Sequence, residues 1–157
     1  MRLIQTVPPV YVLKPGDHQA GVDGDSINCK NCDHVTFLIQ FAALTGDAVL
    51  TINSGATDGT KTTAETFYYR LAGGVQGAAS GDVFGAESSG TTLTLTAATY
   101  ENKLLAVDVP VRELTDGQPF LTLALSSAAS ALNASIVALL GRHRYPAYQP
   151  PSSIPTA

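Results

Sequence analysis

The stretch HVTFLIQFAALTGDAVLTIN, residues His34–Asn53, has the clearest structural pattern in the chain. Apolar and polar side chains alternate in its first half and again in its second, after a break at residues 45–47. Alternation with a period of two is typical of a strand with one buried face, and the Thr-Gly-Asp break is typical of a turn. The stretch therefore predicts a β-hairpin with one apolar face, and Leu38 is the one apolar residue on the outer face of its first strand. The predicted inward residues are Val35, Phe37, Ile39, Phe41, Ala48, Leu50 and Ile52.

The rest of the chain is expected to supply a second layer, because an isolated hairpin is not stable in water. About eight strands separated by turns, with no amphipathic helix, predict an all-β fold, a single antiparallel β-sandwich of jelly-roll type. An alternative stays open for residues 127–140, whose Ala- and Leu-rich composition also suits a buried helix. The further predicted strands lie at residues 26–29, 65–71, 91–96, 103–111, 120–126 and 136–141.

The length of 157 residues suits one domain. We expect the sandwich to span residues 22–144, with an extended arm on either side. Residues 1–21 contain Pro8 and Pro9, which favour an extended path without ladder hydrogen bonds, so this part is predicted to be an arm or an edge segment. Residues 145–157, YPAYQPPSSIPTA, are predicted to form a Pro-rich C-terminal arm.

The composition limits the classes of function. Charged residues make up 14% of the chain, against about 25% in an average soluble domain. So little charge suits a protein whose faces are covered by copies of itself or by a partner. The net charge is -4 and the nine Lys and Arg residues form no basic stripe, so nucleic-acid binding is not expected. No apolar run reaches the roughly 20 residues of a membrane-spanning helix, and no signal-peptide pattern begins the chain, so neither a membrane nor secretion is expected.

Candidate contact residues lie in the arms, in one long loop and after the last strand. The loop, residues 73–90, is rich in Gly and Ser and has two apolar side chains at its centre without an evident core to join. Long loops in compact domains are usually binding loops or disordered. Residues 142–144 form a basic cluster, and such a cluster is usually the solvated end of a strand. The candidate interface residues are Val10, Tyr11, Val83, Phe84, Arg142, Arg144, Tyr145, Tyr148 and Ile154.

No set of residues predicts catalysis. Cys29 and Cys32 form a CxxC pair followed by Asp and His, but a zinc site needs about four ligands and no second pair exists. A redox CxxC normally opens a helix, whereas this pair precedes a strand, so we expect two small, partly buried residues in a turn. Nucleophile-elbow, zinc-protease and phosphate-loop motifs are absent from the sequence, so no enzymatic activity, metal or cofactor is expected. Three tyrosines suit either a sugar site or packing across strands, namely Tyr68, Tyr69 and Tyr100.

The runs HVTFLIQF, TTLTLTA, LLAVDV, PFLTLALSS and VALLGRHRYP together resemble the small β-rich structural proteins of tailed bacteriophages that are encoded near the major capsid protein. The resemblance covers residues 34–146 and is one of pattern and texture. It implies a capsid decoration, or cement, protein that sits on the outside of the shell, often as a trimer, and strengthens it against DNA pressure. The implied partners are the major capsid protein and copies of the chain, in the virion, after synthesis in the host cytoplasm.

A second hypothesis comes from another class of function. It is a carbohydrate- or receptor-binding β-sandwich of a virion fibre or cell surface. The two hypotheses differ in what the protein binds. A cement protein binds particles at the ratio set by the lattice and raises their melting temperature. A lectin binds glycans as a free protein.

Deletion of residues 146–157 tests whether the C-terminal arm docks on a partner. Proline lowers the entropy that an extended segment loses on docking, so the tail can bind in a groove at small ordering cost. We expect the truncated domain to keep a melting temperature close to that of the full chain, while its occupancy on the particle or its self-association falls sharply. Full occupancy with unchanged affinity, or an unfolded truncated domain, would contradict the docking role.

Overall fold

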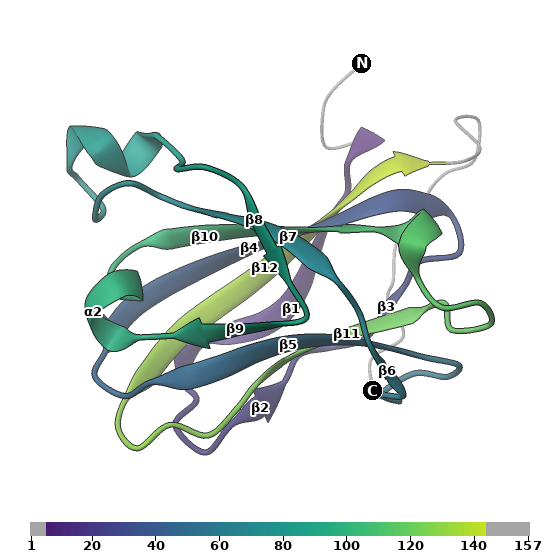
Figure 1. Cartoon of the computed structure of the whole chain (residues 1–157), viewed down its shortest axis with the longest axis horizontal. Helices are drawn as coiled ribbons and strands as arrows, with labels where there is room; N and C mark the ends of the chain where they lie inside the picture. The colour runs from purple at the N-terminus through teal and green to yellow at the C-terminus, as the bar shows by residue number, and fades with distance from the viewer. Residues whose placement is uncertain (1–5, 144–157) are drawn as a thin grey trace.

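The computed structural model describes residues 6–143, with side chains through Gly141, and these residues form two antiparallel β-sheets packed face to face (Figure 1). Sheet A has the strand order β1-β12-β4-β10-β7-β8, and sheet B the order β2-β11-β5-β6, with β3 also on β11 and β9 also on β5. The strands are β1 (Pro9–Asp17), β2 (Val22–Asp23), β3 (Ile27–Asn28), β4 (Cys32–Leu44), β5 (Ala48–Gly55), β6 (Thr63–Ala64), β7 (Phe67–Leu71), β8 (Ser88–Gly90), β9 (Thr92–Leu95), β10 (Leu104–Pro110), β11 (Phe120–Leu125) and β12 (Leu132–His143). The helical turns are η1 (Ala79–Asp82), α2 (Ala97–Tyr100) and η2 (Val111–Glu113).

The strand order is that of a jelly roll with one insertion. A jelly roll has eight strands. With β2 and β3 counted as the two halves of one broken strand, these eight are, in chain order, β1, β2 with β3, β4, β5, β9, β10, β11 and β12. Sheet A then places the first, eighth, third and sixth positions side by side, and sheet B the second, seventh, fourth and fifth. Strands β6, β7 and β8 are inserted after β5, and β7 with β8 extends sheet A beyond β10. The predicted all-β sandwich is confirmed, with twelve strands instead of about eight.

The predicted hairpin at residues 34–53 is wrong, although its two strands and their buried faces are right. β4 lies in sheet A and β5 in sheet B, so residues 45–47 lead the chain from one sheet to the other. β12 and β10 pair with the two sides of β4, so the edges of β4 are already occupied. The apolar faces of β4 and β5 therefore point toward each other across the core instead of lying side by side.

Gly46 sits where this crossing meets the connection between β11 and β12. Its N–H donates to the Ala131 carbonyl oxygen at 3.4 Å, and the Thr45 N–H donates to the same oxygen at 3.0 Å. A Cβ atom at Gly46 would come within 2.6 Å of the Ser130 backbone nitrogen. Glycine is therefore required for the close approach of the two crossings.

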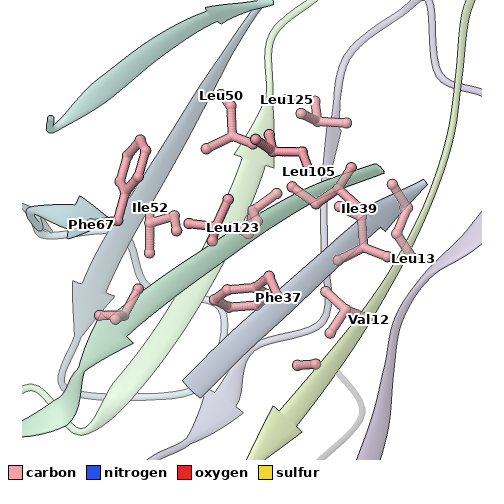
Figure 2. Packing of buried hydrophobic residues seen from close by; sticks show 14 of the residues in the cluster. Val12, Leu13, Phe37, Ile39, Leu50, Ile52, Phe67, Leu105, Leu123 and Leu125 are labelled. Carbon is pink, nitrogen blue, oxygen red and sulfur yellow. The ribbon is translucent and has the colours of Figure 1, made fainter. Parts of the chain in front are cut away.

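The inward faces of both sheets meet in one core (Figure 2). Phe37 and Ile39 of β4 and Leu105 of β10 are 0% exposed, and they lie opposite side chains of sheet B. Because two complementary apolar faces are removed from water together, this packing supplies most of the hydrophobic stabilisation. The sheet B residues that face them include Leu50, Ile52, Leu123 and Leu125.

The first predicted arm belongs in part to the sandwich. Residues Pro9–Asp17 pair with β12 and form the edge strand β1 of sheet A. The register shifts between Tyr11 and Leu13, and this bulge buries both Val12 and Leu13 in the core. An arm that ends at residue 21 is therefore wrong for Pro9–Asp17, which belongs to the sandwich. For these residues the other interpretation, an edge segment, is correct.

The helix considered for residues 127–140 does not form. Leu132–His143 is strand β12, which pairs with β4 on one side and β1 on the other. Along it, buried Ile136, Ala138 and Leu140 alternate with the partly exposed Val137 and Leu139. A continuous apolar run of this kind is what a strand shows when both of its faces are apolar.

Replacing Phe37 tests the register of the central strand. Phe37→Ala is expected to lower the free energy of unfolding by about 3–5 kcal/mol, because a fully buried ring leaves a cavity. Thr36→Ala, the adjacent residue on the outward face, is the control and is expected to cost about 1 kcal/mol for one hydrogen bond. Chemical denaturation of both variants measures the two losses, and equal losses would mean that the strand is shifted by one residue.

Candidate interaction surface

The two predicted contact residues of the N-terminal region point to opposite faces of β1. Val10 is partly buried and packs against the core from the inward face. Tyr11 is 61% exposed on the outward face of sheet A. The structure therefore keeps Tyr11 as a candidate contact residue and gives Val10 a role in packing.

The loop at residues 73–85 is closed at its base, where Phe84 forms a bridge with Ala72. The Gly73 N–H donates to the Val83 carbonyl at 2.8 Å, which joins the two ends of the loop, and the Gly85 N–H donates to the Leu71 carbonyl of β7 at 2.9 Å. Val83 remains 63% exposed and Phe84 36% exposed. In Figure 1 the teal turn of η1 marks this loop, which stands above sheet A on the side away from sheet B. Val83 and Phe84 are thus available to a partner.

The remaining predicted contact residues are only partly within the described chain. Arg142 lies in β12, where the structure describes its backbone alone. Arg144, Tyr145, Tyr148 and Ile154 lie outside the described residues, as does the whole predicted C-terminal arm. Their role stays a prediction from the sequence.

Tyr11 is part of an apolar strip on the outward face of sheet A. Its Cα partner across the ladder is Val137 of β12, and the partner of Val137 on β4 is Leu38. Leu139, two residues further along β12, pairs with Thr36 and extends the strip. The apolar strip is defined by Tyr11, Leu38, Val137 and Leu139, and all but the widely exposed Tyr11 are partly exposed.

Sequence reasoning identified Tyr11 and Leu38 of the apolar strip but missed the two β12 residues. The signal was the unbroken run Ile136–Leu140, since a strand with one solvated face should alternate. Strands β5 and β9 of sheet B do alternate in that way. Their outward side chains are polar apart from Val49, and they include Thr51, Asn53, Thr92 and Thr94.

A polar hollow lies beside the apolar strip, over β10, β7 and β8. It has a volume of about 250 Å³ and is lined by residues that include Thr36, Tyr68, Arg70, Glu87, Ala106 and Asp108. Both Asp108 carboxylate oxygens are held from β4, one by the Thr36 hydroxyl at 2.9 Å and the other by His34 Nδ1 at 3.1 Å. Arg70 Nε lies 3.7 Å from the Glu87 carboxylate at the open side.

Of the three tyrosines considered for a sugar site, Tyr68 alone borders the outward face. Tyr69 packs against Phe67, with ring centroids 6.0 Å apart. Tyr100 is 7% exposed and meets Phe41 edge-on at 5.9 Å, and burial raises its pKa. Tyr69 and Tyr100 therefore act in packing, as strand tyrosines commonly do.

A larger groove runs between the loop and the ends of the sheet A strands, with a volume of about 590 Å³. Its side chains are mainly amides and hydroxyls, with one Lys and one Asp, so the groove has little net charge. The polar side chains that line it are Gln40, Gln76, Asp82, Asn102, Lys103, Asn133 and Ser135. Amide side chains both donate and accept, which suits the hydrogen-bonding groups of an extended polypeptide backbone.

Cys29 and Cys32 are free thiols with 1% and 2% exposure. The Cys29 thiol donates to the Ile27 carbonyl oxygen at 3.5 Å, and the Cys32 thiol donates to the Cys29 carbonyl oxygen at 3.7 Å. A hydrogen bond with the Cys32 side chain, together with burial, raises the pKa of Cys29 well above its ordinary value. The pair therefore packs in the turn between β3 and β4 as protonated thiols.

The buried carboxylate of Glu65 has structural partners. Glu65 is the one buried carboxylate among residues 6–141, and it accepts hydrogen bonds from the Ser54 hydroxyl and the Thr115 N–H. Among the described residues, His, Cys, Asp and Glu nowhere gather in a group of three that could hold a metal ion. The described helices are all too short or too polar to cross a membrane.

Comparison with protein-family models, curated proteins and solved structures gave no match to this chain.

The cysteine environment predicts slow thiol chemistry. A raised pKa means that the thiolate fraction of Cys29 at pH 8 is lower than that of a free cysteine, and burial blocks access as well. We expect a thiol-reactive disulfide reagent to label the native protein far more slowly than the protein unfolded in guanidinium, where both thiols react. Rapid native labelling, or stoichiometric zinc that is lost in the Cys29→Ser, Cys32→Ser variant, would contradict this assignment.

Proposed function

We propose that the chain is a non-enzymatic virion structural protein that binds the outer surface of a bacteriophage capsid and stabilises it. The partners are the major capsid protein and other copies of the chain. The apolar strip is the surface that we assign to this contact. The assignment to a capsid rests on the resemblance of the sequence pattern to phage decoration proteins, and the structural support is the contrast between the two outward faces.

That contrast is the main observation in favour of a protein partner. An antiparallel sheet that faces water on one side normally has polar residues there, as sheet B does with its outward threonines. In the apolar strip, the outward positions on three neighbouring strands are occupied instead by Tyr11, Leu38, Val137 and Leu139. Exposed aromatic side chains of this kind are enriched among the residues that dominate binding energy. The strip is therefore suited to burial against another protein surface.

A symmetric oligomer, with a trimer favoured, strengthens this proposal on physical grounds. The strip is small, so a single copy would gain limited binding free energy from it. An oligomer placed on a symmetric lattice position engages several capsid subunits at once, and each later contact forms at high effective concentration. The low charged fraction of 14% also agrees with a protein that works with its faces covered.

Placing a charge on the apolar strip tests the proposal. Val137→Lys is expected to weaken binding to capsids assembled without this protein by about 100-fold, because a charged group would be buried without a partner. Thr94→Lys, on the outward face of sheet B, is the matched control and is expected to bind as the wild type does. Sedimentation measures the occupancy on the capsid, and calorimetry measures how far binding raises the capsid melting temperature. We expect this rise to be absent for Val137→Lys and present for Thr94→Lys.

Unchanged occupancy of a folded Val137→Lys protein would reject the apolar strip as the contact surface. Equal loss in both variants would mean that added charge itself, and not its position, prevents binding. A native mass measurement of the free wild-type protein reports the oligomer number. A monomer at all concentrations would reject the preformed oligomer.

A further inference from the structure

We propose that the polar hollow on sheet A binds a neutral, polyhydroxylated ligand of the glycan class, with Tyr68 against a sugar ring and Asp108, Arg70 and Glu87 hydrogen-bonded to its hydroxyls. This site is separate from the apolar strip, and the inference does not depend on a capsid partner.

The hollow is formed by strand register. Asp108 of β10 pairs with Thr36 on one side and with Tyr68 on the other, so three outward side chains stand in one row across β4, β10 and β7. In the next row, Ala106 pairs with Leu38 and with Arg70. The small Ala106 between larger neighbours leaves the space that becomes the hollow of about 250 Å³. Pockets for drug-sized ligands begin at about 300 Å³, so this hollow suits a single ring.

The hydrogen-bonding groups of the hollow are held in place before a ligand arrives. Each Asp108 oxygen accepts one bond from β4, at 2.9 and 3.1 Å, and a carboxylate has about four lone-pair sites. Asp108 therefore keeps capacity to accept hydrogen bonds from ligand hydroxyls while its orientation is fixed. Because Asp108, Tyr68 and Arg70 stand on the adjacent strands β10 and β7, little backbone freedom is lost when a ligand binds.

The charge balance indicates what kind of ligand fits. Two carboxylates, Asp108 and Glu87, face one guanidinium, Arg70, and Arg70 Nε is already 3.7 Å from Glu87. The hollow therefore has no excess of positive charge that would hold a phosphate or another anion. It offers strong acceptors and strong donors side by side, and a sugar hydroxyl both donates and accepts. Tyr68 adds an aromatic ring with an apolar face and a polar tip for the C–H face of the sugar.

The hollow adjoins the apolar strip but shares no residue with it. On the strip side, Leu38 pairs with Ala106 and Leu139 pairs with Thr36, and both partners line the hollow. On the other side the hollow extends over β7, so Arg70 stands four strands away from Tyr11 in the sheet order. At a strand spacing of about 4.8 Å, this separates them by roughly 19 Å.

Titration of the free full-length protein with methyl glycosides, followed by the NMR shifts of its backbone amides, tests this inference. The probes are the methyl glycosides of glucose, galactose, mannose and N-acetylglucosamine, with inorganic phosphate as a charged comparison. We expect at least one glycoside to shift the amides around Ala106, Asp108 and Tyr68, with a Kd on the order of 1 mM for a single ring. Phosphate is expected to leave these amides unchanged.

Two variants and one control make the result specific. Tyr68→Ala and Asp108→Asn are each expected to weaken glycoside binding by about tenfold or more, while their amide spectra remain those of a folded sandwich. Thr94→Ala, on sheet B, is expected to bind as the wild type does. The inference is overturned if no glycoside shifts these amides, if the shifts centre on another surface, if phosphate alone binds, or if both variants bind as well as the wild type. Because this experiment contains no capsid, its failure leaves the proposed capsid contact unaffected.

Discussion

Burial of the inward faces of β4 and β5 against each other is the interaction on which the rest of the structure depends. Each strand is apolar on one face, and neither could bury that face inside a hairpin of its own. The chain therefore changes sheet at residues 45–47, and it does so again at nearly every later connection. The exceptions are the steps from β5 to β6 and from β7 to β8. This repeated crossing interleaves distant parts of the sequence, so that β12 lies between β1 and β4.

The same topology determines which side chains become neighbours on the surface. The apolar strip is assembled from β1, β12 and β4, whose residues are separated by up to 128 positions between Tyr11 and Leu139. A flat sheet face presents such side chains as one continuous surface, because every second residue of each strand points the same way. In contrast, the threonines of sheet B interact well with water. The outward side of sheet A therefore has an apolar strip across three strands, whereas β5 and β9 of sheet B present threonines.

Sheet A also combines two kinds of chemistry on one face. Toward its β1 edge it is apolar, and toward its β8 edge it holds the Asp108 carboxylate between His34 and Thr36. The insertion of β6, β7 and β8 creates this second half, since Tyr68, Arg70 and Glu87 all belong to the inserted segment. Without the insertion, β10 would be the edge of the sheet and the hollow would lack one wall. The insertion thus supplies the wall of the hollow on the β7 side.

The sequence by itself determined the local properties of this protein. The alternation at Val35, Phe37, Ile39 and Phe41 predicted a strand and its buried face correctly, because a period of two depends only on local backbone geometry. The number and spacing of such runs predicted the all-β sandwich. Cys29 and Cys32 were predicted as partly buried residues in a turn, and they lie there almost fully buried. Of the predicted contact residues with described side chains, Tyr11, Val83 and Phe84 are exposed, whereas Val10 is partly buried against the core.

The tertiary structure alone decided how these parts combine. Pattern cannot distinguish a hairpin from a crossing between two sheets, because both place the same side chains against a core. The partners of β4 are β10 and β12, which lie some 70 to 100 residues further along the chain, and they exclude β5 from its edges. The apolar strip and the polar hollow depend on those long-range registers, so neither could be predicted as a surface. Both surfaces are decided by which strands pair with each other. All strands of the chain compete for these pairings, so no local stretch of sequence predicts them.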